Sequence, residues 1–201
     1  DVCSSDLTKY KEVNMKEINF KDTRGSSLFK IKNGSSIMLQ ALDNKPVSIT
    51  CRYIDERSFY LKNARFSFKE FAELVEQNSC IFYPEHGTAK TYEIYQIHSD
   101  KEHDYKFMHY SYAKHQFHAK HYTKVYMGMM SEQTSLESIF YKHNLDYRPF
   151  ARKMRSLSVS NVIVVNDHGK SKAYYVDSFG FKEVPQFLQQ LNQTKHKEYA
   201  R

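Results

Sequence analysis

The chain has 201 residues, of which 40% are hydrophobic and 15% aromatic, and its formal net charge is +7. This length allows one domain or two small ones with a buried core. No stretch approaches the roughly 18 to 20 consecutive apolar residues of a membrane span, so we expect a soluble, cytoplasmic protein with no membrane contact. The excess of cations favours anionic partners but specifies no fold.

The first seven residues, DVCSSDL, resemble the conceptual translation of a widely used sequencing adaptor. We therefore expect residues 1–7 to be an artefact that takes no part in the fold. Without Asp1 and Asp6, which carry two negative charges, the formal charge rises from +7 to +9. Cys51 and Cys80 then remain as an unpatterned pair, which is more typical of buried thiols in a reducing compartment than of a disulfide framework.

Short runs of alternating or β-branched residues between turn signals predict an antiparallel meander in residues 8–83. The expected strands are 17–20, 28–31, 36–40, 47–54, 58–61 and 81–83. Ser67 and Glu70 have the spacing of a capping box. They predict a helix that ends near Gln77 and closes over the sheet with its apolar stripe. Residues 8–83 should thus form a small β-rich α+β module.

Pro84 and Gly87 mark residues 84–90 as a linker, because both residues interrupt regular structure. A second domain is expected at residues 91–191, with strands at 92–97, 105–110 and 123–127. A further capping box begins at Thr134 and predicts a helix through His143.

The β-branched run 162–165 is too short for a helix and indicates a strand buried on both faces. A turn and a second strand at 173–176 complete a β-hairpin, which Gly180 ends. A short helix over 183–190 and a frayed tail at 192–201 follow. The predicted fold class is therefore α+β: two small domains, each an antiparallel β-sheet with one main helix, plus a short C-terminal helix.

Four blocks in the C-terminal half carry a resemblance to a known family. They are YEIYQI (92–97), TSLESIFYKHN (134–144), SLSVSNVIVV (156–165) and YYVDSFGFKEVP (174–185). Their order and content resemble the YodL-like domain over about residues 90–190. Asn161 departs from the family, which usually has Asp at this place, and residues 148–155 (RPFARKMR) are unusually basic.

The resemblance implies a bacterial mobile-element context, since YodL-like domains occur in phages and as modules of large polyvalent proteins of conjugative elements. The family has no established catalytic activity, so the resemblance implies context rather than chemistry. The segment CRYIDERSFYLKNARFSFKEFAELVE is similar to a small β-rich module that often precedes this domain.

Cations alternate with aromatic residues between positions 106 and 155, which is the composition of a surface that contacts phosphates and stacks on bases. The candidate nucleic-acid-binding residues are Lys106, Lys114, Lys120, Lys124, Arg148, Arg152, Lys153, Arg155, Tyr112 and Phe117. Alternatively, the aromatic residues are core and the lysines only solvate the outside. Convergence of the cations on one face would favour nucleic-acid binding, and scattering would favour a protein partner bound through an apolar patch.

His115, His118 and His121 recur at three-residue spacing, which in a helix could bring their imidazoles together as metal ligands. No Cys, Asp or Glu accompanies them between His109 and His121, so we expect a polar, partly solvated face and no metal or cofactor.

Four further residues are interpreted as structural. Ser158 and Asn161 should satisfy backbone groups at a strand entrance, and Asp177 and Gly180 should form a strand-ending turn. Since no motif supports catalysis, the preferred function is a non-enzymatic accessory module of a bacterial mobile-element protein that binds an unidentified protein partner. The alternative is direct binding of DNA or RNA.

Overall fold

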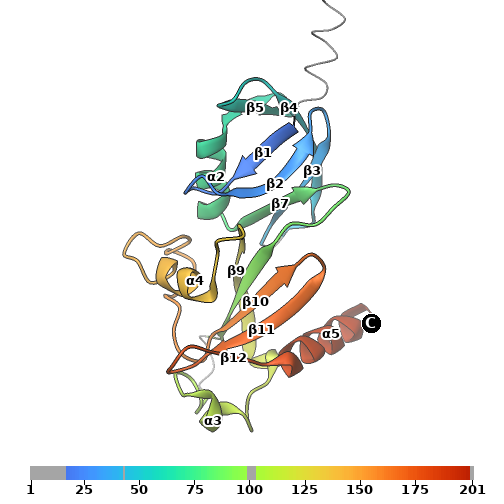
Figure 1. Ribbon diagram of the computed structural model, residues 1–201. Coiled ribbons are helices and arrows are strands. Elements are labelled where there is room, and N and C mark those ends of the chain that lie inside the picture. Colours follow the sequence, from blue (N-terminus) through green and yellow to red (C-terminus); the bar gives the residue numbers. More distant parts are fainter. Residues whose placement is uncertain (1–16, 43, 99–102, 200–201) are drawn as a thin grey trace, which may run out of the picture. The chain divides into compact units, whose positions relative to one another are not determined.

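The computed structural model describes residues 17–42, 44–98 and 103–199 (Figure 1). The chain divides into two compact units: residues 1–90 with 129–133, and residues 91–128 with 134–201. Both units combine antiparallel strands with helices, which confirms the α+β class. The adaptor-like segment 1–7 lies outside the described residues.

Among the described residues, the first unit has a five-stranded sheet of order β6-β5-β4-β3-β7 and a separate two-stranded sheet of β1 and β2. The strands are β1 Glu17–Lys21, β2 Ser27–Lys32, β3 Ser36–Ala41, β4 Val47–Tyr53, β5 Ser58–Leu61, β6 Ala64–Ser67 and β7 Cys80–Pro84. Strands β3, β4 and β5 form the expected meander, but β2, which we expected in the same sheet, pairs with β1 instead. Strand β6 is an addition that the sequence did not predict. Cys51 is buried and Cys80 half-buried, and both are free thiols.

Phenylalanine rings fill the core of the first unit. Phe20 lies at its centre, with ring centroids 5.2 Å from Phe59 and 5.0 Å from Phe82. Helix α2, Phe68–Gln77, buries Phe71 and Val75 against this cluster. Such edge-to-face contacts give a small unit a rigid core with few aliphatic residues.

The predicted capping box of α2 is present. The Ser67 hydroxyl accepts from the Glu70 N–H at 3.1 Å, and the Glu70 carboxylate accepts from the Ser67 N–H at 3.2 Å. Two otherwise unpaired helix-terminal donors are thereby satisfied. The hydrogen bonds from Ser67 also hold the pKa of Glu70 below its ordinary value, so the carboxylate is ionised at neutral pH.

Replacing Ser67 by alanine should lower the free energy of unfolding of the first unit by about 1 kcal/mol, because one N–H loses its acceptor. Urea denaturation followed by circular dichroism would measure the change. Ser178→Ala, at an exposed serine outside any helix cap, is the matched control. An unchanged midpoint for Ser67→Ala would show that the cap contributes nothing.

In the described part of the second unit, five antiparallel strands form a sheet of order β12-β11-β10-β8-β9. They are β8 Thr91–Ile97, β9 Tyr122–Met129, β10 Val162–Asp167, β11 Lys170–Val176 and β12 Phe181–Glu183. Strand β10 pairs with both β11 and β8, so Val162 lies opposite Tyr175 and Tyr95. The predicted buried strand is thus central to its sheet, and its residues Val162, Ile163 and Val164 are all buried, so both of its faces are covered there.

Short helical segments flank this sheet: α3 Tyr110–Ala113, the 3₁₀ turn η1 Ala119–His121, α4 Leu136–Lys142 and α5 Pro185–Tyr199. Helix α5 packs on β11 and η1. Its Phe187 is fully buried, with ring centroids 5.2 Å from Tyr95 and 5.4 Å from Tyr122. His143, at the C-terminal end of α4, contacts β8 through a 2.9 Å hydrogen bond between its Nε2 and the Tyr92 hydroxyl.

The predicted strand at residues 105–110 is wrong. These residues form turns that lead into α3. Phe107 has φ +67°, which an extended strand does not accommodate. Its N–H donates to the Ser160 hydroxyl at 2.9 Å, so a tertiary contact replaces the ladder hydrogen bond.

Two helix termini also differ from expectation. The N-cap of α4 is Ser135, whose partner is Ser138, and not Thr134 with Glu137. Helix α5 continues to Tyr199 where we expected a frayed tail at 192–201. Residues 192–199 contain no Gly or Pro and are rich in helix-compatible Gln, Lys and Glu, so the helix persists without an apolar stripe.

Candidate functional site

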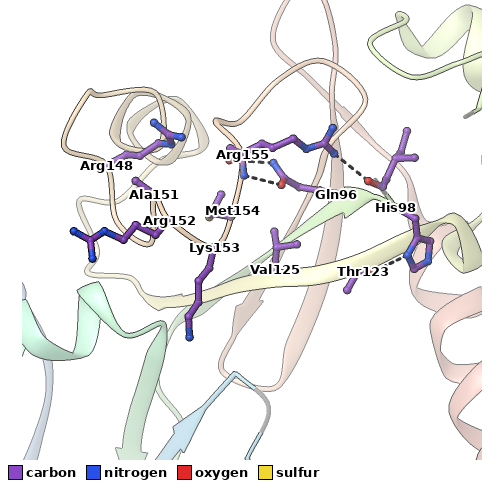
Figure 2. Close-up of a pocket in the computed structure, with 11 residues that line it drawn as sticks. Gln96, His98, Thr123, Val125, Arg148, Ala151, Arg152, Lys153, Met154 and Arg155 are labelled. Carbon is purple, nitrogen blue, oxygen red and sulfur yellow. Dashed lines mark hydrogen bonds between the residues drawn. The ribbon is translucent and has the colours of Figure 1, made fainter. Parts of the chain in front are cut away.

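A pocket of about 530 Å³ lies in the second unit, between strands β8 and β9 and the segment that follows α4 (Figure 2). It brings together all four cations of residues 148–155, which we call the basic loop. The lining residues are Gln96, Ile97, His98, Thr123, Val125, Arg148, Ala151, Arg152, Lys153, Met154 and Arg155.

The Gln96 side chain anchors the basic loop to the sheet. Its Nε2 donates to the carbonyls of Arg155 and Ser156, each at 3.2 Å, and its Oε1 accepts from the Arg155 N–H at 3.3 Å. Nε2 also lies 3.1 Å from Oδ1 of Asn161, which itself accepts from the Ser158 N–H at 2.9 Å. Gln96 is 3% exposed, so these bonds satisfy a polar group that burial would otherwise penalise.

The four cations have different surroundings. The Arg155 guanidinium donates from Nη2 to the Ile97 carbonyl at 3.0 Å, which fixes it at the end of β8. Nε of Arg148 is buried and has no hydrogen-bond partner among the described residues. Arg152 is exposed, and the exposed Lys153 ammonium lies 5.2 Å from the centroid of the Phe150 ring. Figure 2 shows the four charged ends pointing in different directions around the loop.

The charged residues that line the pocket are all cationic. Within the described part of the chain, no Asp or Glu lines it. On the sheet side, His98 and Thr123 are paired with each other through a 2.8 Å hydrogen bond between Nδ1 and Oγ1. Val125, Ala151 and Met154 supply apolar surface. The pocket therefore combines uncompensated positive charge with an apolar wall.

The lysines at 106–124 do not line this pocket. Lys124 forms an ion pair with Glu93 at 3.1 Å, so its charge is already compensated. The Lys106 ammonium lies 5.5 Å from the centroid of the Phe107 ring, and Lys114 and Lys120 are exposed. The predicted cation set therefore separates into a clustered loop group and a dispersed group.

The two predicted stacking aromatics also separate. Tyr112 is 48% exposed, whereas Phe117 is 6% exposed and belongs to the core with Tyr122 and Phe187. Phe117 is therefore not available to a ligand at the surface. Its burial corresponds to the alternative that the aromatic residues of this segment are core.

The histidines are held by local hydrogen bonds. Nδ1 of His118 accepts from the Lys120 N–H at 3.1 Å, and Nδ1 of His121 lies 2.8 Å from the Tyr105 hydroxyl. Burial, with a smaller contribution from the stacked His103, lowers the pKa of His121 to about 4. His115 is exposed. Among the described residues, no group of three or more His, Cys, Asp or Glu is arranged to hold a metal ion.

The residues interpreted as structural have backbone partners. Asn161 orients Ser158, as above. Oδ1 of Asp177 accepts from the N–H of Ser178 at 2.8 Å and of Tyr110 at 3.1 Å. Gly180 has φ +76° and its carbonyl accepts from the Asp177 N–H at 3.0 Å, which forms the strand-ending turn.

Sequence reasoning missed the sheet side of the pocket, namely Gln96, His98, Thr123 and Val125. One signal was visible: Gln96 is a lone amide in the otherwise apolar and aromatic end of YEIYQI, where a buried polar group needs specific partners. Which partners it has depends on residues about 60 positions later in the chain.

The second unit is thus an antiparallel α+β unit whose pocket has four cations among its lining residues. In the comparison with protein families, residues 91–187, which lie in the second unit, match the YodL-like domain. The strands of the first unit agree with the expected β-rich module before it.

No curated protein and no solved structure matches the chain. In the part of the chain that the structure describes, no helix combines the length and the apolar character needed to cross a membrane.

Proposed function

We propose that the YodL-like unit is a non-enzymatic accessory module of a bacterial mobile-element protein, and that it binds nucleic acid through the basic loop. The observation that carries this proposal is that Arg148, Arg152, Lys153 and Arg155 all line one pocket, with their charged ends pointing in different directions around it (Figure 2). The mobile-element context rests on the family.

The arrangement of charge favours a polyanion. A single small anion is best held by donors that converge on one point, whereas the charged ends of the basic loop spread around it (Figure 2). Phosphates repeat along a nucleic-acid backbone, so several of them can meet cations that are spread in this way. The net charge of +7 supports the same class of partner through long-range attraction.

The chemistry of the pocket supports binding without catalysis. Its described lining has no carboxylate, Ser or Cys, and contains one hydroxyl, that of Thr123. Its histidine, His98, is paired through Nδ1 with Thr123. Contacts to phosphate from Arg and Lys need no such groups.

A protein partner is the second candidate, because three apolar side chains beside α3 are exposed. Phe107 is 56% exposed, Met108 43% and Tyr112 48%. They lie together in the sequence and could dock on an apolar surface.

The nucleic-acid proposal predicts salt-dependent binding that the basic loop controls. Fluorescence anisotropy of a labelled 20-nucleotide single strand with the full chain, at several salt concentrations, would measure it. In the triple variant Arg148→Gln, Arg152→Gln and Lys153→Gln, the slope of log K against log[salt] should fall by about 2, since each lost phosphate contact removes about 0.7. Arg155 is retained because its bond to Ile97 supports the loop.

The control is Lys45→Gln, Lys62→Gln and Lys69→Gln, which removes the same charge from exposed positions of the first unit. It should retain the wild-type slope. Absence of binding at low salt would contradict the proposal, and so would an equal fall of the salt slope in both triple variants. In that case a pull-down comparing wild type with Tyr112→Ser would test the protein-partner alternative.

A further inference from the structure

We infer that the pocket receives one nucleotide of a single strand, with its phosphates on the basic loop and its base against the apolar wall, and that it does so without selecting the base. This inference rests on the proposed function and specifies its ligand: single-stranded rather than double-stranded nucleic acid.

The size of the pocket is the first argument. About 530 Å³ is within the range of small-molecule sites and far exceeds the space that a phosphate group needs. A surface that only follows a backbone requires charge and no hollow. The base of an unpaired nucleotide can turn into such a hollow, whereas a base inside a duplex is stacked and paired and does not reach it.

The distribution of lining residues is the second argument. Val125 lies on the β9 side and is half-buried, and Ala151 lies on the loop side and is exposed, so these two residues supply apolar surface from both directions, whereas Met154 is only 5% exposed (Figure 2). The imidazole of His98, directly after the end of β8, adds a flat ring, a type of surface on which bases stack. The cations stand on the same loop as Met154 and Ala151, so one nucleotide can contact both kinds of surface.

The buried donor of Arg148 is the third argument. Its Nε is shielded from solvent and has no partner among the described residues, which is costly for a charged group unless a ligand supplies an acceptor. A phosphate oxygen is a suitable acceptor, since guanidinium groups bind phosphate through paired N–H donors. Arg148 itself is one of the residues that line the pocket.

The neutral polar groups of the pocket determine selectivity. Reading a base edge requires donors and acceptors that are not already used. The Gln96 amide is engaged at both its nitrogen and its oxygen, and the Thr123 hydroxyl is paired with His98. With these groups occupied, the pocket has apolar contact and stacking to offer, and both are sequence-tolerant.

Fluorescence anisotropy with the full chain tests the inference. The probes are dT15, dA15, a 15-nucleotide strand in which every position is abasic, and a 15-base-pair duplex, all at one low salt concentration. We expect dT15 and dA15 to bind within about threefold of each other. Each should bind about tenfold more tightly than the abasic strand and the duplex. A tenfold difference corresponds to the stacking free energy of about one base.

The variant Ala151→Trp tests the pocket directly, because it fills the hollow from an exposed position and leaves every charge in place. We expect it to reduce the single-strand preference about tenfold while keeping the salt dependence. Ala64→Trp, at an exposed alanine of the first unit, is the matched control, and circular dichroism would confirm that both variants are folded.

The outcomes separate the two proposals. No binding of any probe would overturn both. Binding in which the duplex or the abasic strand equals dT15, or in which Ala151→Trp leaves the preference unchanged, would overturn the pocket inference and leave nucleic-acid binding standing. A difference between dT15 and dA15 of more than about threefold, in either direction, would overturn the absence of base selection.

Discussion

Replacing Phe20 by alanine is expected to lower the free energy of unfolding of the first unit by about 3 to 5 kcal/mol, which approaches the whole stability of a small domain. Phe20 is 1% exposed. Its ring lies 5.0 Å from Phe29 and 5.0 Å from Phe82, centroid to centroid, and two strands and α2 supply further rings. The neighbours are held by their own strands and cannot collapse into the space, so most of the cavity would remain.

Native-state hydrogen exchange read by mass spectrometry would measure this effect in peptides from residues 17–84. The matched control is Phe179→Ala, because Phe179 is 98% exposed and its loss opens no cavity. A loss below about 1 kcal/mol for Phe20→Ala would show that the cluster repacks, and would contradict a rigid aromatic core.

Acidification should destabilise the second unit through His143, which is fully buried. Its Nε2 is bonded to the Tyr92 hydroxyl, and the Tyr126 ring lies 4.6 Å away, centroid to centroid. Burial, with smaller contributions from Lys142 and Arg148, lowers the pKa of His143 to about 3. In the unfolded chain the imidazole has its ordinary pKa of about 6.5.

The direction of this pH dependence follows from proton binding. Between pH 6.5 and 3 the unfolded chain binds a proton that the folded chain does not, so stability is complete above pH 6.5 and falls as the pH drops towards 3. One such group contributes a slope of at most about 1.4 kcal/mol per pH unit. His121, whose pKa is about 4, adds to the loss in the same direction.

Urea denaturation at pH 7, 6, 5 and 4 would measure this dependence in wild type and in His143→Gln, which cannot titrate. The variant should be less stable at pH 7. On acidification, however, its free energy of unfolding should fall less steeply than that of wild type, by at most about 1.4 kcal/mol per pH unit. His115→Gln is the control, because His115 is exposed. Identical slopes for wild type and His143→Gln would show that folding does not lower the pKa of His143.

Local patterns in the sequence were sufficient for most elements of this fold. The run VIVV predicted the central strand β10, and Ser67 with Glu70 predicted both the start of α2 and its cap. These features depend on residues within one or two turns of each other, so periodicity and capping chemistry reveal them directly. The same reasoning placed a strand at 105–110, where the contact between Phe107 and the distant Ser160 outweighs the local preference.

In the candidate site, too, the local sequence predicted some features and long-range contacts decided the others. Composition alone drew attention to the cations of RPFARKMR, and the YodL-like resemblance followed from four ordered blocks. Composition could not tell Phe117, which is core, from Tyr112, which is exposed, because an aromatic residue suits either place. Composition also could not predict that the basic loop forms a pocket with β8 and β9.

The sequence by itself determined the α+β class, the family of the second unit and the positive charge of its loop, since these depend on residue types and their local order. The tertiary structure alone decided that four loop cations share one pocket, that Lys124 is neutralised by Glu93, and that Gln96 holds the loop. Those facts depend on which distant backbone and side-chain groups become neighbours. Hydrogen bonds and ion pairs act over a few ångströms in space, whatever the separation along the chain.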